Sequence, residues 1–284
     1  MKYEAAGCIS IKKLKKECEI DDNMSCHSRT VGSDGMIYLL FAEDHHILKS
    51  NYTLKYNYAV IRILPDWYCG DIIAYEYIPL SEYTEKLYSA HPFGNDIILI
   101  GQNRKGDIGI ILNSEHHEYR RISFAPYAAY NKTLVTDDKT IIMGMYDEYC
   151  LRRSSPIHIF DEYGNRTEVM AYHMQNIVDV IAMNLDEHND LWYNAYPDYI
   201  FYCTDGRSLQ SGSNTMTTAF AVLPCNKGII AEEYGGFRLY RFNGQTENVF
   251  FTYGGNPILP DASSFMQNKA AISSGDTLYF IEIL

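Results

Sequence analysis

The chain has 284 residues, 46% of them hydrophobic, and its 24 basic and 36 acidic residues give a formal net charge of −12. This length and apolar content suffice for one large core, so we expect a single domain over residues 1–284. The negative charge repels phosphates and disfavours nucleic-acid partners, and no apolar run is long enough for a signal-peptide core or a membrane span. We therefore expect a cytoplasmic protein without a membrane partner, whose seven singly scattered cysteines are reduced.

The first 30 residues contain strand candidates but no complete unit of their own. Residues 6–14 (AGCISIKKL) have the composition of a strand. Residues 11–20 (IKKLKKECEI) fit either an amphipathic helix or an exposed edge strand, because apolar residues alternate irregularly with lysine and glutamate. We predict a strand here.

Six later segments share one pattern, a polar turn followed at once by an apolar run of β-forming residues. In chain order they are residues 33–43 (SDGMIYLLFAE), 94–103 (GNDIILIGQN), 137–147 (DDKTIIMGMYD), 188–198 (HNDLWYNAYPD), 225–235 (CNKGIIAEEYG) and 274–284 (SGDTLYFIEIL). Their mean spacing of about 48 residues is that of propeller blades. Further strand-like runs follow most segments, so each unit is predicted to be a small antiparallel meander, with a short helix or insertion at residues 80–90.

The last segment ends the sequence after one strand and leaves an incomplete sixth unit. We predict that the N-terminal strands pair with this C-terminal strand, because the pairing would close the ring and cover an exposed edge. The predicted fold is therefore an all-β, six-bladed β-propeller closed by its two ends.

Residues 186–196 (DEHNDLWYNAY) and 205–207 (DGR) resemble bacterial propeller repeats in which a short acidic or asparagine-containing turn leads into an aromatic innermost strand. Through them the whole chain is similar to bacterial six-bladed β-propellers, many of them uncharacterised. The resemblance concerns architecture and implies that the recurring segments are innermost strands. The Gly-His and Trp-Asp pairs of WD repeats and the double glycine of kelch repeats are absent, so no family of defined activity is indicated.

Charged residues recur where these predicted inner strands end. Aligning the segments places Glu43, Arg104, Asp147 and Asp198 at equivalent positions, with Glu232 a little earlier. Such residues would gather near one mouth of the channel, where they could bind a divalent cation, sugar hydroxyls or a basic peptide. Ordinary solvation of strand ends is the alternative.

Two further candidates lie in turns. Trp67 follows Pro65 and Asp66 and precedes a Cys-Gly pair, so we expect an exposed indole in a hairpin loop that could stack on a ligand. The acidic turn at residues 186–190 (DEHND) carries oxygen ligands that could bind calcium. However, it lacks the spacing of a calcium loop, and we interpret its side chains as local turn hydrogen bonders.

The sequence contains no GxSxG, HExxH, phosphate-loop, GxGxxG or paired CxxC motif, so we predict neither a cofactor nor a metal. The leading hypothesis is a non-enzymatic binding or scaffold propeller that recognises a peptide, protein or glycan through loops on one face of the ring. The alternative is a metal-assisted hydrolase or lyase that acts on a small sugar-like molecule at the channel mouth. A bound metal would distinguish the two hypotheses.

Overall fold

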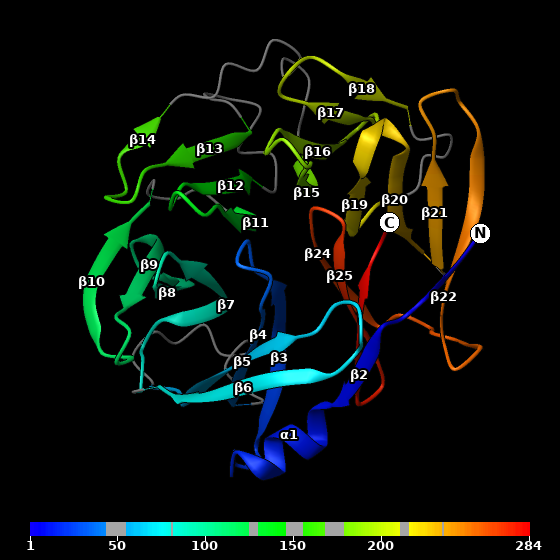
Figure 1. Cartoon of the computed structure of the whole chain (residues 1–284). Coiled ribbons are helices and arrows are strands. Elements are labelled where there is room, and N and C mark those ends of the chain that lie inside the picture. The colour runs from blue at the N-terminus through cyan, green and yellow to red at the C-terminus, as the bar shows by residue number, and fades with distance from the viewer. Residues whose placement is uncertain are drawn as a thin grey trace.

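The computed structural model describes residues 1–43, 55–80, 82–124, 130–145, 156–167, 179–210, 216–234 and 236–284. Six β-sheets surround a central axis, as Figure 1 shows in a view along that axis. The chain is a six-bladed β-propeller, which confirms the predicted fold class. The described part of the chain includes no helix with the length and apolarity needed to cross a membrane.

The first three blades follow one another along the chain, each a four-stranded meander. They consist of β3 (Met24–Val31), β4 (Ile37–Glu43), β5 (Tyr58–Pro65) and β6 (Ile72–Pro79); β7 (Lys86–Phe93), β8 (Asp96–Asn103), β9 (Gly106–Leu112) and β10 (Glu118–Ser123); and β11 (Tyr130–Val135), β12 (Ile141–Met145), β13 (Ile157–Phe160) and β14 (Arg166–Thr167).

The last three blades complete the ring. They consist of β15 (Asp179–Leu185), β16 (Leu191–Tyr196), β17 (Phe201–Cys203) and β18 (Ser208–Leu209); β19 (Ala219–Leu223), β20 (Gly228–Glu233), β21 (Gly236–Tyr240) and β22 (Thr246–Tyr253), with β1 (Lys2–Glu4) and β23 (Asn256–Pro257) beside β22; and β24 (Ala262–Met266), β25 (Lys269–Ser274), β26 (Thr277–Glu282) and β2 (Gly7–Ser10). A short 3₁₀ turn, Pro224–Asn226, joins β19 to β20.

The recurring segments are not the innermost strands, contrary to the prediction. In the first five blades they form the second strand, and in the sixth the segment at residues 274–284 forms the third strand, β26. The side chains of β8 and β12, for example, are buried on both faces along most of their length. Such continuous apolar runs belong to strands that have neighbours on both edges and blades on both faces. The core lies between blades, where Leu40 and Val60 of the first blade pack with Leu99 and Ile110 of the second.

The ring closes as predicted, by pairing of the two ends of the chain. Strand β2 runs antiparallel to β26, with Gly7 opposite Phe280 and Ser10 opposite Thr277. The preceding strand β1 runs parallel to β22 of the fifth blade, a pairing that the sequence did not predict. The N-terminal segment therefore joins the fifth and sixth blades, as the blue ribbon shows in Figure 1.

The strand predicted at residues 11–20 is wrong, because this region contains helix α1 (Ile11–Glu17). The Ser10 hydroxyl accepts the N–H of Lys13 at 3.1 Å, which is a helix N-cap. The carboxylate of Asp276 accepts the N–H of Lys12 at 3.0 Å, and Ile11 and Leu14 are buried at helical spacing. One residue that fixes the helix start therefore comes from the opposite end of the chain. Residues 86–90, where a helix or insertion was expected, belong to strand β7.

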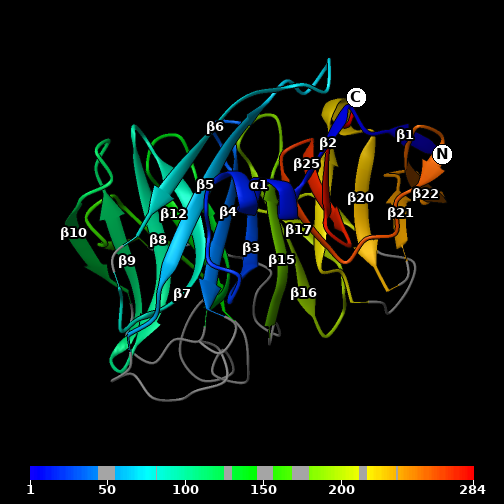
Figure 2. The ribbon, with the colours of Figure 1, turned by 90° about the horizontal axis from the view of Figure 1, so that it is seen from below.

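Trp67 lies in the β5–β6 turn, as predicted, but its expected exposure is wrong: only 9% of its surface is accessible. The indole N–H donates to the carbonyl of Gly35 at 3.0 Å, and the ring packs edge-on against Phe280, with centroids 6.0 Å apart. Figure 2 shows this hairpin rising above the other blades beside β2. Gly70 in the same turn approaches the backbone at the start of β2 so closely that an added Cβ would lie 1.8 Å from the carbonyl oxygen of Ala6, the residue before β2. The turn with Trp67 thus fastens the first blade to the closing strand.

Candidate functional site in the central channel

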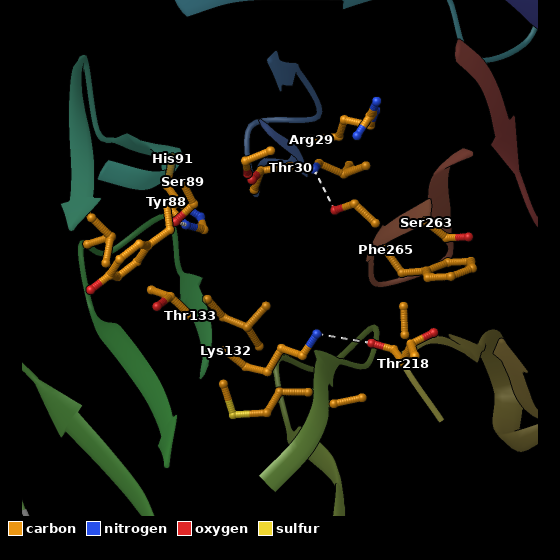
Figure 3. Close-up of a pocket in the computed structure, with 18 of the residues that line it drawn as sticks. Arg29, Thr30, Tyr88, Ser89, His91, Lys132, Thr133, Thr218, Ser263 and Phe265 are labelled. Carbon is orange, nitrogen blue, oxygen red and sulfur yellow. Dashed lines mark hydrogen bonds between the residues drawn. The ribbon is translucent and has the colours of Figure 1, made fainter. Parts of the chain in front are cut away.

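The first strands of the six blades enclose a cavity of about 220 Å³ at the centre of the ring (Figure 3). Each of these strands is the edge of its sheet, so its outer backbone N–H and C=O groups are directed toward the channel. Some of these groups bind neighbouring blades, as the N–H of Val31 does by donating to Ser264 Oγ at 3.0 Å. The channel wall is therefore polar in its backbone as well as in its side chains.

Hydroxyl groups and two cations dominate the polar lining. The hydroxyl-bearing residues include Ser28, Thr30, Ser89, Thr133, Thr218 and Ser263. The cations are Arg29 from β3 and Lys132 from β11, which lie on opposite sides of the cavity in Figure 3. Among the described residues that line it there is no carboxylate. This composition is the reverse of that of the whole chain, which has an excess of acidic residues.

Lys132 projects across the cavity toward the fifth blade (Figure 3), and its Nζ donates to the carbonyl of Thr218 at 3.2 Å. The Thr218 hydroxyl in turn donates to Glu232 Oε2 at 2.8 Å, so Glu232 lies behind Thr218 in the channel wall. Burial lowers the pKa of Lys132, and the nearby charge of Glu232 opposes this shift. Burial also raises the pKa of Glu232, against the effect of its hydrogen bonds. An anion in the channel would favour both protonated forms.

The second and third blades also contribute hydrogen-bonded groups in or beside the cavity wall. Ser89 Oγ and His91 Nε2 are 2.8 Å apart, and burial lowers the pKa of His91 to about 4, so its ring is neutral at neutral pH. The hydroxyl of Tyr88 donates to Asp107 Oδ1 at 3.0 Å. Burial raises the pKa of Asp107 to about 6. Tyr130, which also lines the cavity, is hydrogen-bonded to His158 Nδ1.

Two of the residues predicted to form a charged channel mouth have partners within their own hairpins. Glu43 at the end of β4 accepts a hydrogen bond from Asn57 Nδ2 at 2.8 Å. Asp198 in the β16–β17 turn accepts one from the Tyr202 hydroxyl at 2.5 Å. Arg104 is exposed in the β8–β9 turn. None of these three side chains lines the cavity described above.

Of the other predicted site residues, Asp147 lies outside the described residues. The structure places the predicted residue Glu232 beside the channel. Its carboxylate does not line the cavity itself but accepts a hydrogen bond from Thr218, which does. Trp67 is part of the contact between the first and sixth blades and is not available for stacking on a ligand.

Within the described part of the chain, one group of three side chains has the geometry to hold a metal ion, namely Asp186, Asp190 and Cys203. The guanidinium of Arg207 already lies there, with Nη2 at 2.8 Å from Asp186 and 3.1 Å from Asp190. The backbone N–H groups of residues 188 and 190 also donate to Asp186 Oδ1. This confirms the interpretation of the acidic segment as a hydrogen-bonded turn. The Arg207 guanidinium thus occupies the position that a metal cation would take between Asp186 and Asp190.

The sequence reasoning missed the residues that line the channel, above all Arg29 and Lys132. It assigned the innermost position to the apolar segments, whereas the innermost strands are the more polar runs that precede them. The sequence of β3, MSCHSRTV, shows the available signal, because polar residues are enriched in it compared with the apolar β4, IYLLFAE. A strand that has one edge open to a channel accommodates such residues more readily than a central strand does.

Comparison with protein-family models and with curated protein sequences finds no match. Solved structures do match. The virginiamycin B lyase from Staphylococcus aureus aligns over 98% of both chains with a TM-score of 0.55 and 11% sequence identity. A gluconolactonase-like protein aligns over 97% of this chain and 91% of its own, with a TM-score of 0.51 and 9% identity.

PorZ, a surface component of the type-IX secretion system of Porphyromonas gingivalis, aligns over 92% of this chain but only 46% of its own, with a TM-score of 0.53 and 9% identity. At these identities the likeness concerns the fold. It confirms the predicted resemblance to bacterial propellers. The neighbours include a lyase, a lactonase-like protein and a secretion component, so they assign no specific activity.

Proposed function

We propose that this protein is a non-enzymatic binding propeller whose central channel takes a small acidic sugar. The observation that carries the proposal is the Lys132 ammonium in a cavity lined by hydroxyl groups and by no carboxylate among the described lining residues. An ammonium group with one hydrogen bond to Thr218 retains two N–H donors for a ligand carboxylate. The surrounding hydroxyls of serine and threonine can each donate to or accept from sugar hydroxyls.

The size of the cavity also favours a monosaccharide. Its volume of about 220 Å³ lies below the range of roughly 300–1,000 Å³ that is common for drug-sized ligands. Tyr88, Tyr130, Phe220 and Phe265 add aromatic surface to the wall, which suits the apolar face of a sugar ring.

The metal-assisted hydrolase or lyase considered from the sequence has less support. The candidate metal ligands Asp186, Asp190 and Cys203 are bound to Arg207 and do not line the channel. Binding without catalysis predicts that an acidic sugar is recovered chemically unchanged after prolonged incubation with the protein.

Isothermal titration with D-glucuronate, D-galacturonate and the uncharged analogue D-glucose tests the proposal. We expect an acidic sugar to bind and glucose to bind at least about tenfold more weakly, since a charge-assisted hydrogen bond contributes about 1.5–3 kcal/mol. Lys132→Met should remove this preference. Lys227→Met, which deletes the same charge from an exposed turn, should leave it unchanged.

Binding should also weaken as the pH rises through the lowered pKa of Lys132, at a lower pH than for an exposed lysine. The proposal would be contradicted if glucose bound as tightly as the acidic sugars, or if no sugar bound at all. It would also be contradicted if Lys132→Met kept the preference for acidic sugars.

A further inference from the structure

A second candidate site lies between the second and third blades, and its residues do not belong to the lining of the channel cavity. Here the guanidinium of Arg120 on β10 lies among three aromatic rings. Its central carbon is 5.5 Å from the ring centroid of Tyr163 and 5.9 Å from the centroids of Tyr119 and Phe93. Phe93 is buried, whereas Tyr119 and Tyr163 are 51% and 67% exposed. The guanidinium thus rests on a buried ring and is flanked by two rings that a ligand can reach.

The chain builds this arrangement from both blades. The register of β10 against β9 shifts between Glu118 and Arg120, and this irregularity allows the adjacent Tyr119 and Arg120 side chains to contact each other. Strand β10 is the outermost strand of its blade (Figure 1), and in the described structure no strand pairs with its outer edge. The hydroxyl of Tyr119 is fixed by a 2.7 Å hydrogen bond to Asp96 Oδ2.

Tyr163 is held over Arg120 by the β13–β14 turn. Asp161 Oδ1 accepts the N–H groups of Tyr163 and Asn165 at 2.9 and 2.8 Å, which fixes the turn conformation. Gly164 has a φ of +85°, and a Cβ at this position would lie 2.2 Å from Ile122 Cγ2. The turn therefore sits directly on β10, and its position does not depend on a bound partner.

Arg120 has no carboxylate partner in the described structure. Its Nε is buried and makes no hydrogen bond. The two acidic residues nearby have other partners, since Asp96 accepts from Tyr119 and Glu162 lies 3.8 Å from the ammonium of Lys139. A guanidinium offers planar N–H donors that match a carboxylate, and packing on aromatic rings preserves this geometry. The site is therefore organised for a carboxylate that the described residues do not supply.

We propose that Arg120, Tyr119 and Tyr163 bind the carboxylate of an acidic residue in an extended peptide that lies along β10. The open edge of β10 offers backbone hydrogen bonds to a peptide strand, a mode of recognition that a free sugar cannot use. The local charges do not favour a second negative charge on the ligand, because Arg120 and Lys139 are balanced by Asp96 and Glu162. A dianionic phosphate would meet more repulsion there.

A fluorescein-labelled heptapeptide Thr-Val-Thr-Glu-Thr-Val-Thr, with blocked ends, tests the proposal by fluorescence anisotropy against the full-length protein. The matched peptide carries glutamine in place of glutamate. We expect the glutamate peptide to bind at least about tenfold more tightly than the glutamine peptide. Arg120→Gln should abolish this difference, and Arg120→Lys should restore only part of it because lysine lacks the planar fork.

Two further variants keep the test decisive. Tyr163→Ser removes an exposed ring from a turn fixed by Asp161, so it should weaken binding of the glutamate peptide while thermal unfolding stays unchanged. Arg104→Gln deletes the same charge from an exposed turn and should have no effect on peptide binding.

The proposal would be overturned if the two peptides bound with equal affinity. It would also be overturned if Arg104→Gln and Arg120→Gln lost equal affinity for the glutamate peptide. Displacement of the peptide by free glucuronate at comparable affinity would overturn it in favour of an acidic sugar. Because Lys132 is not part of this site, Lys132→Met should bind the peptide normally.

Discussion

Replacing Gly70 with alanine tests whether the β5–β6 turn holds the ring closed. Gly70 has a φ of +82°, and its missing side chain makes room for the backbone of the closing segment, with the Ala6 carbonyl oxygen 1.8 Å from the position of a Cβ. On the other side of this contact, a Cβ at Gly7 would lie 2.0 Å from the Gly70 carbonyl oxygen. Neither neighbour is a flexible side chain, so the alanine variant must displace backbone.

The destabilisation has two parts that the chain allows us to separate. The left-handed conformation alone costs an alanine about 1–2 kcal/mol. Displacing a packed neighbour costs about 1–3 kcal/mol more. Gly244 has the same φ of +82°, and a Cβ there would meet nothing within 4 Å. Gly244→Ala should therefore lose only the first part, and Gly70→Ala should be less stable than Gly244→Ala by about 1–3 kcal/mol.

Equilibrium urea unfolding, followed by far-ultraviolet circular dichroism and by tryptophan fluorescence, measures both variants. Trp67 lies in the affected turn and against Phe280 of the closing blade. With Trp192 replaced by Phe in all the proteins compared, the Trp67 fluorescence should change at a lower urea concentration in Gly70→Ala. If the two alanine variants lose the same stability, the contact between this turn and β2 does not stabilise the ring closure.

Two further predictions concern buried charges. Arg207→Ala leaves the buried carboxylate of Asp186 without its cation and should lower the free energy of unfolding by about 3 kcal/mol. Added Mn²⁺ should restore part of the stability lost in Arg207→Ala and should not stabilise the wild type. If Arg207→Ala were as stable as the wild type, the role of Arg207 would be contradicted. The raised pKa of Asp107, about 6, means that the folded state holds this proton more tightly than the unfolded state does, so its contribution to stability falls as the pH rises from about 4 to 6. The lowered pKa of His91, about 4, has the opposite effect, because the unfolded state binds more protons between about 4 and 6.5. Asp107→Asn should therefore gain stability with rising pH more steeply than the wild type in urea titrations between pH 4 and 6, and parallel pH profiles would refute this assignment.

The sequence predicted the blade count and the closure because both depend on local signals. Polar turns followed by apolar runs mark each blade, and the lone C-terminal strand requires a partner. The sequence did not indicate which strand of a blade faces the axis. That position depends on how the sheets are arranged around the ring, and it determined whether Glu43 or Lys132 would be found near the channel.

Two other predictions from the sequence were wrong for the same reason, namely that they depend on contacts between distant parts of the chain. The helix at residues 11–17 depends on Asp276, and the burial of Trp67 depends on Phe280, so in both cases the decisive neighbour is far away along the chain. The candidate site around Arg120 likewise joins residues of two blades, because Tyr163 of the third blade contacts Arg120 of the second. Contacts between blades carry no local pattern, and a single sequence therefore cannot reveal them.

The pairing of β2 with β26 bears on how the molecule is made. Nearly all the other strands are synthesised between β2 and its partner β26, so the nascent chain carries an unsatisfied strand edge until β26 is made. The first five blades can assemble in order, but the ring remains an open arc until β26 has been made and pairs with β2. Until then, β2 can pair with a strand of another chain. Slower translation, or a chaperone bound near β2, should therefore increase the yield of correctly closed rings.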